Sequence, residues 1–106
     1  MGPYGVLAAV VNAWLALAPV SAAAQPVTIL AVGDSLTVGF GLAQPDSFTV
    51  QLQAALRKAG HDATVVNAGV SGDTTAGGRS RLAWALAAKP DAVMIELGAN
   101  DGLRGL

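Results

Sequence analysis

Three short apolar runs, each ending in a polar turn that contains glycine, constrain the fold of this chain more than any other feature. The runs cover residues 27–32, 63–66 and 92–97. Between them lie segments whose apolar residues recur at helical spacing, which is the pattern of strand–helix–strand units. Right-handed crossovers make such strands parallel and bring their carboxyl ends to one rim of the sheet. The sequence therefore predicts an α/β domain with a parallel sheet and three polar turns at one edge.

The two connecting segments contain signals for the ends of helices. Asp46 is a good N-cap residue that follows a proline, and Gly60 is a natural C-terminal stop. A second helix is expected over about residues 75–88, since Pro90 cannot continue a helix without losing a hydrogen bond. Apolar residues at helical spacing would pack both helices against the sheet.

The first 24 residues predict a signal peptide. Residues 6–20 are almost entirely apolar, and residues 21–24 have the small side chains of a cleavage site. The apolar segment is shorter than the roughly 18 to 20 residues of a spanning helix, and Asn12 and Pro19 interrupt it. Cleavage after Ala24 predicts an exported protein, periplasmic or secreted, without a stable membrane anchor. The uncharged first five residues are the one feature that argues against this prediction.

Length and composition limit what the chain can be. Removing residues 1–24 from the 106 leaves 82, whereas a three-layer α/β domain usually has more than about a hundred. We therefore expect residues 25–106 to be a fragment of a larger domain. The net charge of −1 and the absence of a long basic run argue against nucleic acid as a partner. With no cysteine, the chain offers neither disulfides nor thiolate metal ligands.

The turns at the strand ends supply residue types that acyl transfer needs. That reaction requires a nucleophile and hydrogen-bond donors aimed at the oxyanion that forms on attack. Ser35 follows the first run and can supply the nucleophile. Its own N–H, the N–H of Gly72 and the side-chain amide of Asn100 can supply the donors. Gly72 has no Cβ, so its N–H can approach a ligand closely.

These turns carry a resemblance to a known family. Gly33-Asp34-Ser35-Leu36, Gly72 and the Gly-Ala-Asn-Asp of residues 98–101 are similar to the first three sequence blocks of the SGNH, or GDSL, hydrolases. The resemblance is to the thioesterase, lysophospholipase and arylesterase branch, and it runs from about residue 27 to 106. It implies a flavodoxin-like three-layer α/β/α sandwich, of which this chain would hold the N-terminal half.

The same resemblance implies a reaction and its residues. Acyl esters, thioesters or lysophospholipids would be hydrolysed through an acyl-enzyme on Ser35, without metal or cofactor. The oxyanion hole would consist of Ser35, Gly72 and Asn100. The family's general base, a His in an Asp-x-x-His block, and its Asp have no counterpart among residues 1–106. The chain alone is therefore expected to be close to inactive.

His61 is not expected to replace the missing base. It lies between the first helix and the second strand, so it would enter the sheet at the end opposite the polar turns. At about 3.3 Å per residue, a strand's length puts it far beyond the hydrogen-bond reach that a general base needs. A solvated position in a loop is the expectation for this side chain.

Three carboxylates are expected to support the site. Asp34 would order the nucleophile turn by accepting backbone N–H groups. Asp73 and Thr74 are expected at the N-cap of the second helix, and Asp101 would either cap a following helix or hold the Asn100 amide. We expect solvated surface positions for three arginines, Arg79, Arg81 and Arg104, and a place at the flank of the helix packing for Trp84.

Other functions fit the sequence less well. A flavodoxin-like binding or signalling domain with Asp34 as phosphoryl acceptor is the alternative, but it does not explain Ser35, Gly72 and Asn100 together. The α/β-hydrolase lipases have a G-x-S-x-G elbow, whereas position 37 here is Thr. A nucleotide site is disfavoured because no G-x-x-x-x-G-K-[ST] follows a strand, and residues 39–44 lack the third small residue of the dinucleotide fingerprint.

Overall fold

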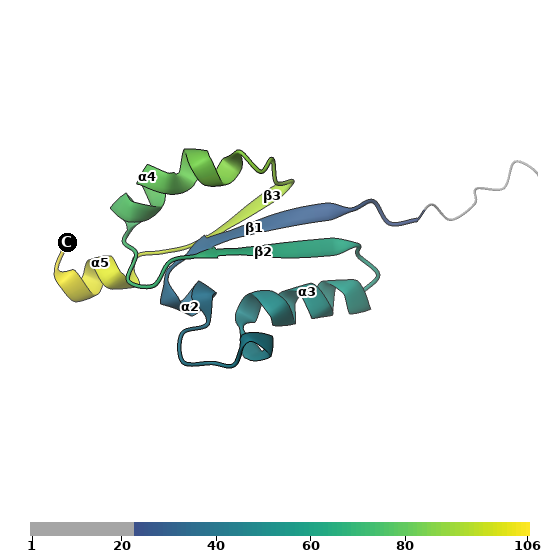
Figure 1. The fold of residues 1–106 in the computed structure, drawn as a ribbon, viewed down its shortest axis with the longest axis horizontal. Coiled ribbons are helices and arrows are strands. Elements are labelled where there is room, and N and C mark those ends of the chain that lie inside the picture. The colour runs from purple at the N-terminus through teal and green to yellow at the C-terminus, as the bar shows by residue number, and fades with distance from the viewer. Residues whose placement is uncertain (1–22) are drawn as a thin grey trace, which may run out of the picture.

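A three-stranded parallel sheet forms the centre of the computed structural model, which describes residues 23–106 (Figure 1). The strands are β1 (Val27–Gly33), β2 (Ala63–Gly69) and β3 (Ala92–Glu96), in the spatial order β2–β1–β3. Both neighbouring pairs are parallel. The predicted α/β class with a parallel sheet is confirmed. The predicted signal peptide lies almost wholly outside the described residues.

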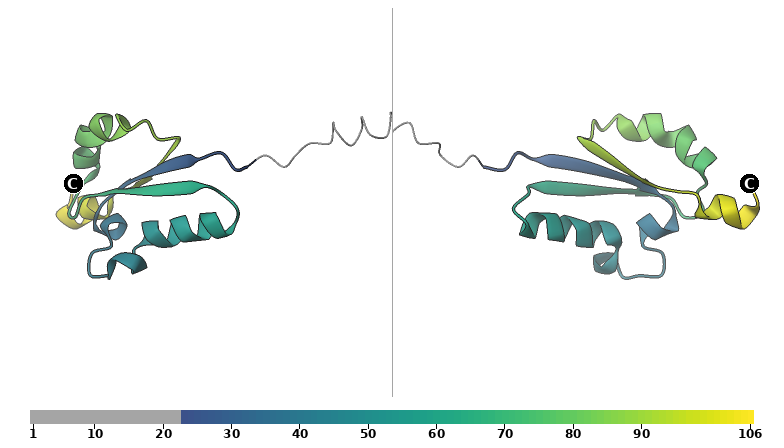
Figure 2. Two further views of the ribbon diagram at one scale, coloured as in Figure 1. Left: turned by 45° about the vertical axis from the view of Figure 1, so that its right-hand side comes forward. Right: turned by 180° about the vertical axis from the view of Figure 1, so that it is seen from behind.

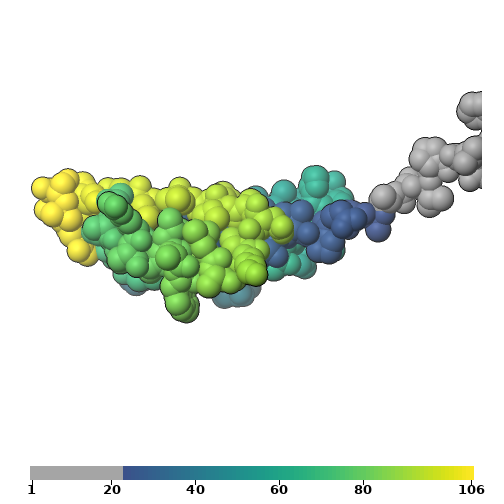
Figure 3. Space-filling view, turned by 90° about the horizontal axis from the view of Figure 1, so that it is seen from above, coloured from purple at the N-terminus to yellow at the C-terminus, as the bar shows by residue number. Residues whose placement is uncertain are grey.

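Helices cover both faces of this sheet. Figure 1 and the turned views of Figure 2 show α2 and α3 on one face and α4 on the other, which gives the three-layer arrangement. Viewed onto α4, α5 lies at one end of the molecule and the N-terminal entry at the other (Figure 3). In chain order the helical segments are α2 (Ser35–Val38), the 3-10 turn η1 (Gln44–Asp46), α3 (Phe48–Lys58), α4 (Thr75–Leu86) and α5 (Ala99–Arg104).

The register of the sheet brings the three strand ends level. Gly33, the last residue of β1, pairs with Gly69 at the end of β2 and with Glu96 at the end of β3. All three polar turns therefore leave the sheet from one rim, as the right-handed crossovers predicted.

The core lies on the central strand. Leu30 and Val32 of β1 are buried together with Ala85 of α4. The apolar side of α4 packs against β1, which is the central strand of the sheet. The outer strand β3 is more open, and Val93, Met94 and Ile95 all expose large parts of their side chains.

Three predicted boundaries are wrong. The second strand continues past residue 66 to Gly69, because residues 67–69 pair with β1 as far as β1 itself extends. The N-cap of α3 is Ser47, since Asp46 belongs to the preceding 3-10 turn in which Pro45 occupies an early position. The helix α4 ends at Leu86, two residues before the predicted end.

Within residues 23–106, every helix is too short or too polar to cross a bilayer.

Candidate active site

Ser35 opens the short helix α2 immediately after β1. Asp34 is the N-cap: its Oδ1 accepts the Leu36 N–H at 2.9 Å, the contact expected for this carboxylate. The Asp34 carbonyl accepts the N–H groups of Thr37 and Val38 at 3.1 and 3.0 Å. As the first residue of the helix, Ser35 has an N–H without an intrahelical acceptor. The turn therefore presents a half-buried serine at the rim, with an N–H that has no intrahelical acceptor.

Gly33 lets this turn pack closely against the sheet. A Cβ on Gly33 would clash with the Thr37 side chain and would lie 2.9 Å from the Glu96 carbonyl oxygen. Only a residue without a side chain allows α2 to fold back over the ends of β1 and β3 at this distance. Gly33 thus allows the turn that carries Ser35 to pack closely against the end of the sheet.

The turn after β2 lies beside the Ser35 turn. The Val70 N–H donates to the Gly33 carbonyl at 2.9 Å, and the Asp73 N–H donates to Val70 at 3.1 Å. Gly72 has a φ of +81°, a conformation that residues with a Cβ rarely adopt. Its carbonyl accepts Nη2 of Arg104 at 2.8 Å. The Gly72 turn is therefore tied to β1 at one end and to α5 at the other.

Asn100 is joined to the same turn. Its Nδ2 donates to the Asp73 carbonyl at 2.8 Å. A side-chain amide has two N–H donors, so this bond leaves one of them for another acceptor. The structure thus brings Asn100 of α5 to the Gly72 turn, and that turn to the strand end that carries Ser35.

Asp73 and Thr74 divide the roles predicted for them. Thr74 is the N-cap of α4, and its side chain accepts the Gly77 N–H at 3.2 Å. Asp73 instead accepts the Thr74 N–H at 3.1 Å and forms an ion pair with Arg81 at 2.7 Å. Asp73 therefore holds the turn to the body of α4.

The expectation that Arg81 is a solvated surface charge is wrong. Its side chain is 22% exposed, and beyond Asp73 it donates to the carbonyls of Ala68 at 2.7 Å and Gly33 at 3.0 Å. Because α4 crosses the sheet above β2 and β1, a guanidinium on its sheet side can reach carbonyls near the ends of both strands. The sequence contained one signal for this ion pair: Arg81 follows the acidic turn residue Asp73 by about two helical turns. Arg104 is exposed but bonds Gly72, and Arg79 is at the surface.

Asp101 has neither of the two predicted roles. It lies within α5, whose N-cap is Gly98, and it accepts both the backbone N–H of Thr75 at 2.9 Å and the Thr75 hydroxyl at 2.7 Å. These bonds lower the pKa of Asp101. Asp101 thus fastens α5 to the first residue of α4.

Glu96 is a site residue that the sequence reasoning missed. It ends β3 directly opposite Gly33, and its Oε1 accepts the Asp34 N–H at 3.3 Å and the Thr37 hydroxyl at 3.0 Å. Burial and the neighbouring Asp34 carboxyl raise the pKa of Glu96, against the lowering effect of these hydrogen bonds. The sequence signal for Glu96 as a site residue was its position at the end of an apolar strand, next to a polar turn.

His61 lies away from this group. It is exposed in the connection between α3 and β2, where its backbone N–H donates to Leu56 at 3.0 Å. That connection is at the end of the sheet opposite α2 and α5 (Figure 1). In the part of the chain that the structure describes, no group of three or more His, Cys, Asp or Glu side chains could hold a metal ion.

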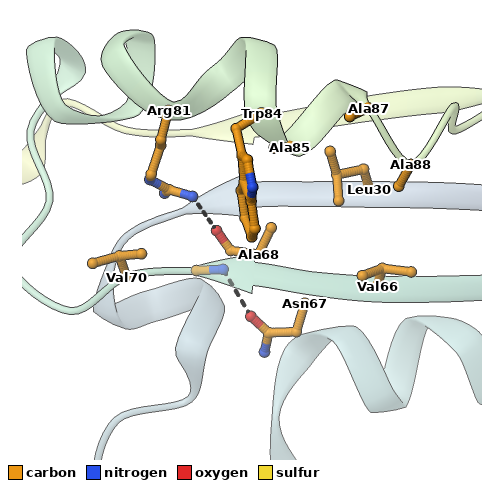
Figure 4. A pocket seen from close by; sticks show the side chains of 11 residues that line it. Leu30, Val66, Asn67, Ala68, Val70, Arg81, Trp84, Ala85, Ala87 and Ala88 are labelled. Carbon is orange, nitrogen blue, oxygen red and sulfur yellow. Dashed lines mark hydrogen bonds between the residues drawn. The ribbon is translucent and has the colours of Figure 1, made fainter.

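An apolar hollow of about 570 Å³ lies between β2 and α4, and Arg81 is at its edge (Figure 4). Leu30, Val66 and Ala85 contribute to its wall, and the ring of Trp84 lies over β2 beside Ala68. Trp84 is 83% exposed, at the flank of the α4 packing. The hollow includes none of the three proposed oxyanion-hole residues.

Comparison with known proteins identifies the relatives of this chain. Residues 31–106 match the GDSL-like Lipase/Acylhydrolase family. Esterase TesA of Pseudomonas aeruginosa is 50% identical over 93 residues, which are 87% of this chain and 45% of that protein. Thioesterase 1/protease 1/lysophospholipase L1 of Escherichia coli is 40% identical over 84 residues, which are 78% of this chain and 39% of that protein. The chain thus spans less than half the length of these relatives.

The fold agrees with the same family. AlinE4, an SGNH-hydrolase family esterase of known crystal structure, superposes with a TM-score of 0.72 at 46% sequence identity. The match covers 80% of this chain and 47% of AlinE4. The arrangement of three level strand ends therefore corresponds to part of the SGNH hydrolase fold. The family match, the related sequences and the shared fold show together that this chain belongs to the GDSL-like lipase/acylhydrolase family.

Proposed function

We propose that the protein is a serine esterase or thioesterase that hydrolyses acyl esters, thioesters or lysophospholipids through an acyl-enzyme on Ser35. The observation that supports this most is that hydrogen bonds join the three turns at the carboxyl ends of the strands. The turn that contains Gly72 donates to the Gly33 carbonyl, and the Asn100 amide donates to the same turn. The names of the relatives, an esterase and a thioesterase/lysophospholipase, agree with this substrate class. The proposed chemistry requires no metal or cofactor.

Each of the three residues has a role in the proposed reaction. The Ser35 hydroxyl attacks the acyl carbon, and the carbonyl oxygen becomes an oxyanion. Donors arranged in advance stabilise that charge at no cost of reorganisation. The donors are the N–H of Ser35, the N–H of Gly72 and the second N–H of the Asn100 amide.

The proposal includes a base outside residues 23–106. A serine hydroxyl is a weak nucleophile without one, and His61 lies at the other end of the sheet. The family resemblance identifies this base as the His of an Asp-x-x-His block. For that reason we expect the 106 residues alone to be close to inactive.

Covalent labelling tests the nucleophile. The full-length protein is incubated with a fluorophosphonate and digested, and the adduct is mapped by mass spectrometry. We expect the adduct on Ser35, because a serine activated for acyl transfer also attacks phosphorus. An adduct on a different residue, or no adduct in a protein that hydrolyses esters, would contradict the proposal.

The phosphoryl-acceptor alternative has its own test in the same protein. Asp34 is 1% exposed and its Oδ1 is bonded to Leu36, which disfavours attack on an external phosphate. Incubation with acetyl phosphate and Mg²⁺ is therefore expected to leave Asp34 unmodified. A phosphorylated Asp34 would favour the signalling function instead.

We also propose that residues 1–24 are a cleaved export signal and that the mature protein is periplasmic or secreted. Residues 23–26 are exposed and precede β1 without regular structure, so a peptidase could reach the bond after Ala24. Amino-terminal sequencing of the protein exported by its host is expected to begin at Gln25. A mature protein that retains Met1 would rule this out.

A further inference from the structure

The last residue of β3 contacts the nucleophile turn from beneath. Glu96 Oε1 accepts the backbone N–H of Asp34 at 3.3 Å and the hydroxyl of Thr37 at 3.0 Å. These two residues flank Ser35 on either side along the chain, and each is 1% exposed. One side chain from a different strand thus holds both ends of the segment that carries Ser35.

Asp34 leaves one oxygen atom in need of a donor. Its Oδ1 accepts the Leu36 N–H, but its Oδ2 is buried and has no hydrogen-bond partner among the described residues. An unsatisfied buried carboxylate oxygen is costly. The Glu96 carboxyl is next to Asp34, because its Oε1 accepts the Asp34 N–H, and the Asp34 carboxyl raises the pKa of Glu96. If both groups were ionised, each could only accept; a proton on Glu96 would supply the donor that Oδ2 lacks.

We infer that Glu96 is a positioning residue, which in its neutral form donates to the Asp34 carboxylate and thereby fixes the turn that presents Ser35. This inference rests on the proposed function of Ser35. Two adjacent carboxyl groups that share one proton satisfy each other, whereas two carboxylates repel. Burial and the Asp34 carboxyl also raise the pKa of Glu96, which favours the neutral form.

Charged and polar groups lie near Glu96 on both faces of the sheet. Among the described residues, Asp34 is the charged group that raises the pKa of Glu96. Across the sheet, the Arg81 guanidinium bonds the Gly33 carbonyl. The neutral amide of Asn67 in β2 bonds the Thr37 carbonyl on the same face as Glu96.

The test compares three forms of the full-length protein by the rate at which a fluorophosphonate labels Ser35. Glu96→Ala removes the contacts, and we expect labelling about 10- to 100-fold slower, because a small displacement of a reacting group has an effect of that size. Glu96→Gln keeps an acceptor for Asp34 and Thr37 and offers an N–H to Asp34 Oδ2 at every pH. We expect it to label at least as fast as the wild type. Equal melting temperatures would exclude general unfolding as the cause.

The pH dependence gives a second readout that does not need the alanine variant to fold. Because the pKa of Glu96 is raised in the folded protein, its neutral form is complete below the usual pKa and is lost as pH rises through the raised value. The ratio of the Glu96→Gln rate to the wild-type rate cancels the titration of the base that activates Ser35. We expect this ratio to rise as pH increases above the usual pKa of a glutamate.

Three results would overturn the inference: Glu96→Ala labelled at the wild-type rate, Glu96→Gln slowed as much as Glu96→Ala, or a ratio independent of pH. An unlabelled wild-type protein would instead count against the proposed function of Ser35. The failure of one proposal is thus distinguishable from the failure of the other.

Discussion

Replacing Ser35 by alanine is expected to abolish both ester hydrolysis and fluorophosphonate labelling of the full-length protein. The substitution removes the hydroxyl but keeps the backbone N–H at the start of α2, so it tests the nucleophile apart from the oxyanion hole. Loss of a serine nucleophile lowers kcat by about 10⁴-fold or more in related chemistry, because the remaining groups can only bind and polarise the substrate. The measurement is kcat on a chromogenic acyl ester.

A second serine provides the matched control for this experiment. Ser80 is exposed on α4, and its hydroxyl donates to the Gly77 carbonyl within the same helix. Ser80→Ala is therefore expected to leave kcat and labelling unchanged. Equal labelling of Ser35→Ala and wild type would show that the nucleophile is another residue.

Replacing Asn100 by alanine is expected to lower kcat by about 10²- to 10³-fold with a smaller change in KM, as for the loss of one oxyanion-hole donor in other enzymes. The physical reason is that the second amide N–H of Asn100 is proposed to meet charge that develops only in the transition state. The first N–H is bonded to the Asp73 carbonyl, so the variant also loses an anchor between α5 and the Gly72 turn.

The control for this variant separates catalysis from anchoring. Gln51 makes the same kind of bond, from its side-chain amide to the Asp46 carbonyl at 2.8 Å, on an exposed part of α3. Gln51→Ala should lose a similar hydrogen bond and leave kcat unchanged. If Asn100→Ala hydrolyses esters as fast as Gln51→Ala, Asn100 is only an anchor.

The sequence predicted those features of the fold that depend on neighbouring residues. The apolar runs and the helical spacing gave the order of strands and helices, and the residue types of the turns gave Ser35, Gly72 and Asn100 as a group. Errors occurred at boundaries. Asp46 has the chemistry of an N-cap, but the 3-10 turn before α3 leaves that position to Ser47.

The contacts of the charged side chains could not be predicted in the same way. Arg81 is bonded to Gly33, which lies 48 positions earlier in the chain, and Glu96 is bonded to Asp34 across 62 positions. Asp101 reaches Thr75 across 26 positions. A charged side chain in a helix or at a strand end is usually solvated, so the local patterns around Arg81 and Glu96 did not identify their distant partners.

The sequence by itself determined the order of the three strands and of the two helices that connect them, and that a serine, a glycine and an amide follow three successive strands. The tertiary structure decided that Gly33, Gly69 and Glu96 end level, and that Glu96 lies under the Ser35 turn. The physical reason is one of range. Backbone preference and apolar periodicity act over a few residues, whereas register and side-chain pairing depend on the close packing of segments distant in the chain.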